Sequence, residues 1–142
     1  MSGPFTGQTS VTIQATASQV WKALTDPEMI RQYLFGTHVT TDWKVGSPIT
    51  YKGVWQGKEY EDKGKILEVV PEKSLVSSYW SGFSGKLDVP ENYSKVAYTL
   101  ERTPNGTRLT ITQSNIPTEK ERDHSIQNWA MVLESLKKLL EK

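Results

Sequence analysis

The chain has 142 residues, enough for one domain with a buried core, and its formal net charge of +1 gives no electrostatic reason to expect nucleic acid or a membrane surface as a partner. It contains no cysteine and two histidines, which excludes disulfides and thiolate sites and predicts neither a metal site nor a cofactor. The opening residues carry no basic and apolar leader pattern, so we expect a single cytoplasmic domain over residues 1–142.

The first predicted elements are one strand and two short helices. The segment TSVTIQAT alternates Val11 and Ile13 with polar residues, which predicts a strand near residues 7–15 with one buried face. In the following segment, TASQVWKALTDPEMIRQYL, Ser18 is a suitable N-cap residue for a helix. Pro27 ends this helix and starts a second one, because proline restricts the residue before it and suits a first helical turn. We expect the pair to brace one end of a sheet.

Six further strands are predicted in the middle of the chain, divided by turn signals rich in glycine, proline and asparagine. Asn105 and Gly106 lie between two alternating runs and favour a tight hairpin, because both residue types tolerate positive φ. Short connections between consecutive strands predict an antiparallel sheet with one covered face. The predicted strands lie near residues 37–42, 48–56, 59–70, 74–81, 93–103 and 106–115.

The last segment, HSIQNWAMVLESLKKLLEK, predicts a long amphipathic helix. No other segment predicts a helix of comparable length, so the apolar stripe of this helix must cover the sheet. Either a solid core or a cavity could lie between them. The stripe consists of Ile126, Trp129, Val132, Leu133, Leu136, Leu139 and Leu140, and the opposite face of Gln127, Met131, Glu134, Ser135 and Lys138.

Three motifs carry a family resemblance that spans nearly the whole chain. They are VWKALTDPE, the G-x-I-x-E-V-x-P-x-x-x-L run from Gly64 to Leu75, and the GTRLT segment followed by a helical Trp129. With this order of elements, the chain resembles the AHSA-type branch (activator of heat-shock chaperone ATPase homologue) of the SRPBCC, or START/Bet v-like, superfamily. The resemblance implies an α+β helix-grip fold: a curved antiparallel sheet of about six to seven strands wrapped around the C-terminal helix, often across a cavity.

The chain departs from its relatives at one place near the expected cavity. Many relatives carry adjacent tryptophans at the end of the second short helix, where this chain has Tyr33, Leu34 and Phe35. This difference predicts a reshaped cavity mouth, so the ligand of a relative does not transfer to this chain. Relatives that activate the chaperone ATPase have a second half that this chain does not contain.

Alternation predicts which strand residues face the helix. The opposite choice of face would bring in Val76 and Trp80 instead. The predicted inward residues are Ile49, Tyr51 and Trp55 of one strand, Leu75, Ser77 and Tyr79 of another, and Val96, Tyr98 and Leu100 of a third.

The aromatic residues among them have two interpretations: they fill a solid core, or they line a cavity. Tyrosine hydroxyls among apolar walls favour the cavity, because phenylalanine would fill a core without a polar group to satisfy. Trp21 is expected in the core, and Trp43 either at the mouth or as an exposed or half-buried residue of a loop. The predicted walls are Tyr51, Trp55, Tyr79, Tyr98, Trp129 and Leu133, with Tyr33, Phe35 and Phe83 nearer the mouth.

Catalytic signals are sparse. His38 and His124 lie in no recognisable catalytic or metal-binding spacing. The acidic residues of GKEYEDKGK, which are Glu59, Glu61 and Asp62, are expected to form a solvated hairpin. The segment SGFSGKLDVPENYSKV is interpreted either as a cavity lid, with Phe83 and Tyr93 as contacts, or as an ordinary long loop.

These observations favour a domain that binds a small apolar or amphipathic molecule, acts as a monomer or weak dimer, and is not an enzyme. The first alternative is a chaperone-associated interaction module with a role in stress response, whose partner would be a heat-shock chaperone. The second alternative is an enzyme of the cyclase or aromatase kind. A binding module needs an open apolar cavity, and an interaction module needs an exposed patch. An enzyme needs titratable groups that converge in a pocket.

Overall fold

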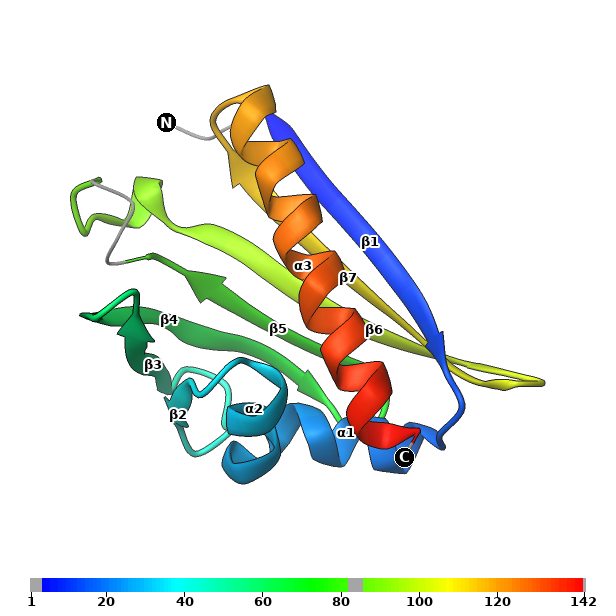
Figure 1. Cartoon of the computed structure of the whole chain (residues 1–142). Helices are drawn as coiled ribbons and strands as arrows, with labels where there is room; N and C mark the ends of the chain where they lie inside the picture. The colour runs from blue at the N-terminus through cyan, green and yellow to red at the C-terminus, as the bar shows by residue number, and fades with distance from the viewer. Residues whose placement is uncertain (1–3, 82–85, 142) are drawn as a thin grey trace.

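A computed structural model describes residues 4–81 and 86–141, apart from the side chain of Trp55. The main elements follow one another in the order that the sequence predicts: one strand, two short helices, six strands and a long helix (Figure 1). Their bounds are β1 (Phe5–Ile13), α1 (Ala17–Thr25), α2 (Pro27–Tyr33), β2 (His38–Thr40), β3 (Pro48–Trp55), β4 (Lys58–Val70), β5 (Ser74–Tyr79), a short 3-10 helix η1 (Pro90–Asn92), β6 (Ser94–Thr103), β7 (Gly106–Ile116) and α3 (Glu119–Leu140).

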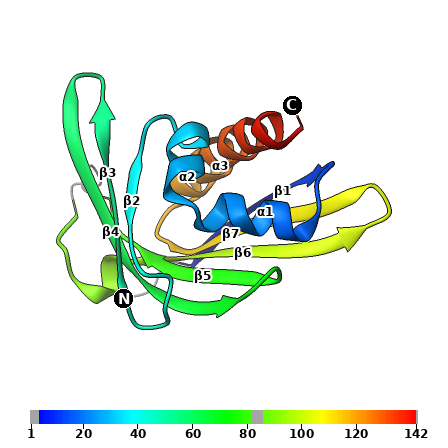
Figure 2. The same ribbon diagram turned by 90° about the horizontal axis from the view of Figure 1, so that it is seen from below.

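The strands form one antiparallel sheet in the order β1-β7-β6-β5-β4-β3-β2. The sheet is strongly curved, and α1, α2 and α3 all lie within its curve (Figure 2). This arrangement confirms the predicted α+β helix-grip fold. The short β2 lies at one edge of the sheet and β1 at the other, and Figure 2 shows these two ends of the sheet on either side of the helices.

Both short helices begin at capping residues. The Thr16 hydroxyl accepts a hydrogen bond from the Gln19 amide (3.1 Å), and the Gln19 side chain accepts one from the Thr16 amide (2.9 Å). The predicted cap at Ser18 is therefore wrong, because this reciprocal pair starts α1 two residues earlier. The predicted break before Pro27 is confirmed, since the Asp26 side chain caps α2 by accepting a hydrogen bond from the Glu28 amide (2.9 Å).

Glycine has a definite structural role in the Gly64–Leu75 motif. A Cβ atom built on Gly64 would lie 1.8 Å from the Ser78 carbonyl oxygen, far inside van der Waals contact. Strands β4 and β5 can approach this closely only because Gly64 has no side chain. The register of the pair also shifts between Ile66 and Glu68, and such irregularities increase the curvature of a sheet.

The predicted hairpin between β6 and β7 is confirmed, with Thr103 opposite Gly106. Only Gly106 of the Asn105-Gly106 pair has a positive φ, 143°. A Cβ on Gly106 would also lie 2.1 Å from the Ile13 carbonyl oxygen. This glycine is therefore required both by the turn and by the approach of β1.

Helix α3 starts earlier than the sequence predicts, because the Thr118 hydroxyl caps it by accepting a hydrogen bond from the Glu121 amide (3.1 Å). It packs mainly on β1, at one side of the sheet, with smaller contacts to β7 and α2 (Figure 1). Gly7 of β1 permits this approach, since a Cβ there would lie 3.1 Å from Ile126. The short helices α1 and α2 lie within the rest of the curve (Figure 2).

The apolar core lies under the C-terminal half of α3. Leu133 and Leu136 are 2% and 1% exposed, whereas Glu134 and Lys138 are exposed, as the stripe predicts. The two leucines belong to a cluster with residues of α1, α2 and the sheet, and Trp21 packs against this cluster as expected. Other members of the cluster are Ile13, Val20, Leu24, Ile30, Ile66 and Leu109.

Candidate functional site

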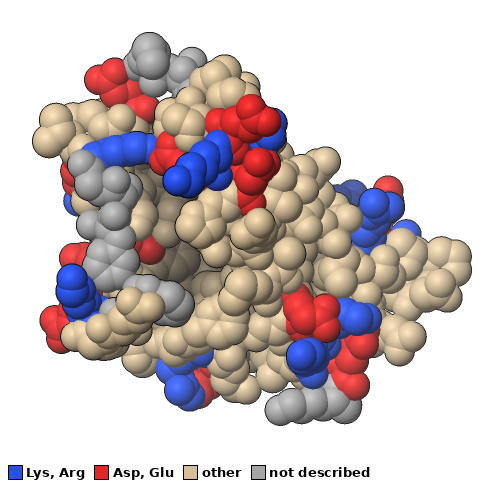
Figure 3. Space-filling view, turned by 45° about the horizontal axis from the view of Figure 1, so that its top comes forward, with Lys and Arg blue, Asp and Glu red and all other residues tan. Residues whose placement is uncertain are grey.

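A cavity of about 770 Å³ lies between the inward face of the sheet and the part of α3 up to Val132, which we call its N-terminal half. It is open to solvent, and Figure 3 shows a hollow on one face of the molecule, flanked by both basic and acidic side chains. Its walls come from β3 to β7, from the segments that follow α2 and β5, and from α3 as far as Val132. The cavity exists because α3 lies along β1 and β7 while the sheet curves away from it.

Aromatic rings form two of the cavity walls. Tyr51 of β3 and Tyr79 of β5 meet edge to face, with ring centroids 6.0 Å apart. Tyr98 of β6 and Trp129 of α3 make a second edge-to-face pair at 6.0 Å. Each contact joins two different elements, so it stabilises the wall as well as providing an apolar surface.

A hydrogen-bonded network fixes the polar wall. The Gln113 side-chain oxygen accepts hydrogen bonds from the Ser125 hydroxyl (2.6 Å) and from the Trp129 indole N–H (2.9 Å). The Gln113 amide nitrogen donates to the Ser94 hydroxyl (2.9 Å). This network connects β6 and β7 to the N-terminal half of α3, and it holds Trp129 in one orientation at the cavity surface.

Asp62 supplies a buried carboxylate in the same cavity. Its residue is 8% exposed, and it accepts a hydrogen bond from the Tyr79 hydroxyl at 2.6 Å. The expected solvated hairpin holds for Glu59 and Glu61, which are exposed, but it is wrong for Asp62. Strand alternation explains the difference, because Asp62 lies on the same side of β4 as the buried Ile66.

The environment keeps the tyrosines of the cavity protonated. Burial raises the pKa of Tyr51 to about 12. Burial also raises the pKa of Tyr98 well above its ordinary value, and burial together with the nearby Asp62 carboxylate does the same for Tyr79. At neutral pH these phenols are therefore uncharged hydrogen-bonding groups.

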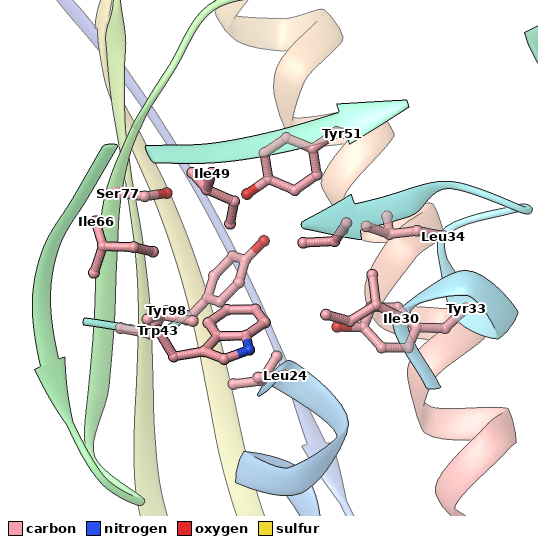
Figure 4. Close-up of a pocket in the computed structure, with 12 residues that line it drawn as sticks. Leu24, Ile30, Tyr33, Leu34, Trp43, Ile49, Tyr51, Ile66, Ser77 and Tyr98 are labelled. Atoms are coloured by element: carbon pink, nitrogen blue, oxygen red, sulfur yellow. The ribbon is translucent and has the colours of Figure 1, made fainter. Parts of the chain in front are cut away.

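A second cavity of about 20 Å³ lies deeper, between the sheet and the short helices (Figure 4). It has room for about one water molecule. Tyr51 and Tyr98 border both cavities, and in Figure 4 their hydroxyl groups point toward each other across the space. Trp43 lines this inner cavity from the loop between β2 and β3, where it is half-buried, so the expectation of a half-buried loop tryptophan is confirmed and a position at the mouth is not.

The structure brings five of the nine predicted site residues together in the larger cavity: Phe35, Tyr51, Tyr79, Tyr98 and Trp129. Two others lie elsewhere. Tyr33 is 4% exposed and borders the inner cavity rather than the mouth, because its helix packs against the core. Leu133 borders neither cavity, because it points into the core beneath α3. Phe83 and the side chain of Trp55 lie outside the described residues.

Sequence reasoning missed Gln113, Ser94 and Ser125 as site residues. A signal was present for Gln113, because it continues the inward series of Leu109 and Ile111 in β7 and is the polar member of that series. Ser94 is the first residue of β6, where alternation gives no direction, and Ser125 lies in α3 just before the predicted apolar stripe. Their role depends on the tertiary approach of α3 to the sheet.

The remaining candidates lie outside the cavity or at its edge. His38 and His124 are exposed, and no group of potential metal ligands occurs among the described residues. Tyr93 stacks on Trp80 with ring centroids 6.4 Å apart, and its hydroxyl donates to Asp88. Of the helices in the described part of the chain, none has the length and apolarity needed to cross a membrane.

The curved sheet, the helix along one side of it and the cavity between them define a helix-grip domain of the SRPBCC type. The family model described as "Activator of Hsp90 ATPase homolog 1-like protein" matches residues 14–141, and the chain belongs to this family. This confirms the resemblance seen in the sequence. Among curated proteins, none matches the chain.

Solved structures show the same fold. A protein from Cytophaga hutchinsonii is 47% identical, with a TM-score of 0.84, over 99% of this chain and 97% of that chain. The Aha1 dimer from Colwellia psychrerythraea is 23% identical, with a TM-score of 0.76, over 96% of both chains. DynU16, from the dynemicin biosynthetic locus, is 21% identical, with a TM-score of 0.81, over 96% of this chain and 47% of that chain.

Proposed function

We propose that this protein binds a small amphipathic molecule in the cavity of about 770 Å³ beneath the N-terminal half of α3. The observation that carries the proposal is the composition of the walls, in which aromatic rings surround a few fixed polar groups. Cavities of roughly 300–1,000 Å³ with such walls are typical of small-molecule sites. The apolar walls would hold the body of the ligand, and Asp62 and Gln113 would orient its polar part.

The mouth of the cavity supports an amphipathic ligand. Phe35, Val54 and Met131 line it and are 59%, 63% and 60% exposed. Exposing large apolar side chains to water at one opening is unfavourable. Contact with an apolar ligand would remove them from water and would therefore be favourable. Phe35 also has a positive φ of 55°, a conformation that is uncommon for a bulky residue and that is found at functional sites.

Uptake of an uncharged apolar fluorescent probe tests the proposal. Val132 lines the cavity, so Val132→Trp should fill it and reduce probe binding by roughly tenfold or more. Glu134→Trp is the matched control, since Glu134 is exposed on the same helix and should not affect binding. Equal probe binding by both variants, or no binding by the parent protein, would contradict a ligand-binding cavity.

A second candidate function is a chaperone-associated interaction module, which the exposed Phe35, Val54 and Met131 favour as an apolar contact surface. A purified heat-shock chaperone ATPase should then be stimulated by the protein, and Phe35→Ser combined with Met131→Ser should remove the stimulation. The dimer described for the Colwellia protein makes a weak homodimer part of this proposal. Sedimentation over a range of protein concentrations measures this dimerisation, and a monomer at every concentration would exclude the homodimer.

A further inference from the structure

The formal charge of the cavity lining indicates which charge the ligand should carry. Three of the described lining residues carry a formal charge: Asp62, Lys86 and Glu121. The Lys86 ammonium and the Glu121 carboxylate form an ion pair at 2.9 Å, so their charges compensate each other. Asp62 therefore gives the described lining a formal charge of minus one.

We propose that the ligand carries a positively charged amine or ammonium group, held between the Asp62 carboxylate and the surrounding aromatic rings. This inference rests on the proposed binding function and names the chemical class that the site would take. The position of Asp62 supports it, because the residue is only 8% exposed and lies inside the cavity wall. A buried carboxylate interacts more strongly with a ligand charge than an exposed one, since water screens it less.

The Asp62 carboxylate already accepts a hydrogen bond from Tyr79, at 2.6 Å. A carboxylate has two oxygens and can accept from several donors at once. The Tyr79 bond fixes the orientation of the carboxylate without neutralising its charge. An ammonium group would add its charge to this arrangement, whereas a ligand carboxylate or phosphate would be repelled.

The rings around Asp62 supply the second element of cation recognition. Tyr79 touches the carboxylate, Tyr51 packs edge to face on Tyr79 at 6.0 Å, and Tyr98 and Trp129 form a second aromatic pair in the lining of the same cavity. The faces of aromatic rings attract cations electrostatically, and this attraction is stronger in sites shielded from water. Rings beside this acid, with further rings in the same cavity, therefore favour an organic cation over a neutral molecule of the same shape.

The test compares three probes with the same alkyl chain: octyltrimethylammonium, octanol and octyl sulfate. Isothermal titration calorimetry measures their dissociation constants for the full chain. We expect the ammonium probe to bind roughly tenfold more tightly than the alcohol, and the sulfate to bind most weakly. Equal binding of the three, or tighter binding of the sulfate, would overturn the ammonium proposal and leave the binding function standing. Absence of binding by all three, together with no uptake of the uncharged probe, would overturn both.

Three variants identify the group responsible for the preference for the ammonium probe over the alcohol. Asp62→Asn keeps the size and a side-chain oxygen and should remove most of the preference for ammonium over alcohol. Glu61→Gln removes the same charge from the adjacent, exposed position of β4 and should keep the preference. Tyr79→Phe keeps the ring and the Asp62 carboxylate but removes the hydroxyl that orients it, so it should reduce the preference less than Asp62→Asn does. A preference that survives Asp62→Asn in a folded protein would overturn the proposal, and so would its loss in Glu61→Gln.

Discussion

The two halves of α3 carry one continuous apolar stripe but rest on different surfaces. In the C-terminal half, Leu133 and Leu136 are buried in the core. In the N-terminal half, Ser125 and Trp129 reach the sheet through hydrogen bonds to Gln113 and border a cavity. The difference originates in the sheet, whose inward residues are apolar beneath one half and partly polar beneath the other. A helical stripe therefore predicts that a surface is covered, but not how closely it is covered.

The strongest test of this difference in packing is to truncate a side chain in the packed half of α3. Leu136 is 1% exposed, so Leu136→Ala should reduce the free energy of unfolding by about 2–5 kcal/mol through lost burial and a new void. Val132→Ala, in a wall that already borders open space, should cost less than about 1 kcal/mol. Urea unfolding of both variants measures the difference. Similar losses would show that the two halves are packed alike.

Enlarging adjacent residues should give opposite results. Leu133→Trp adds volume to a filled core and should destabilise the fold by about 1–3 kcal/mol without directly occupying the cavity. Val132→Trp should have a small effect on stability, because its new ring can enter the cavity. Thermal melts of the two variants distinguish the positions. A Val132→Trp variant that is destabilised as strongly as Leu133→Trp would indicate a solid core beneath both.

The polar network offers a smaller test of how the N-terminal half is held. Gln113→Leu removes the acceptor of both Ser125 and Trp129 and should cost about 1–2 kcal/mol. The effect is moderate because water in the open cavity can replace part of the lost bonding. Amide hydrogen exchange should rise in the first turns of α3 and stay unchanged around Leu136. Uniform exchange along the helix would show that the halves are not held separately.

A pH titration tests the burial of one residue of the cavity wall. The unfolded chain loses the Tyr51 proton near pH 10, whereas the folded protein holds it to about pH 12 because burial raises its pKa. The folded state therefore binds more protons above pH 10, and stability falls as pH rises from 10 to 12, by up to about 1.4 kcal/mol per pH unit for this group. Tyr51→Phe should make the fall in melting temperature shallower over this range. An unchanged slope would mean that Tyr51 is not buried as described.

Much of the fold was predictable because period-two strands, the Pro27 break and the terminal stripe each depend on local sequence. The same alternation placed Tyr51, Tyr79 and Tyr98 on the inward face. The position of Leu133 was not predictable, because helical periodicity gives the direction of a side chain but not whether the sheet beneath it is near or far.

Asp62 was missed for a different reason. Its neighbours in GKEYEDKGK are charged, which indicates a solvated turn, but β4 extends through this segment and its alternation turns Asp62 inward. The charge of a segment and the side of the strand on which a side chain lies are separate properties. Burial depends on the side of the strand. An inward-facing acid in a long strand is therefore a better candidate for a site than an equally charged neighbour.

Methyl-resolved NMR during titration with an amphipathic probe tests the central claim most directly, since it observes both halves of α3 in one experiment. Binding in the cavity should shift the methyl signals of Met131, Val132 and Val96 and leave those of Leu136 and Leu109 almost unchanged. Shifts of equal size in both groups, or shifts confined to the core leucines, would contradict a molecule in which one half of the helix covers a binding cavity and the other a solid core.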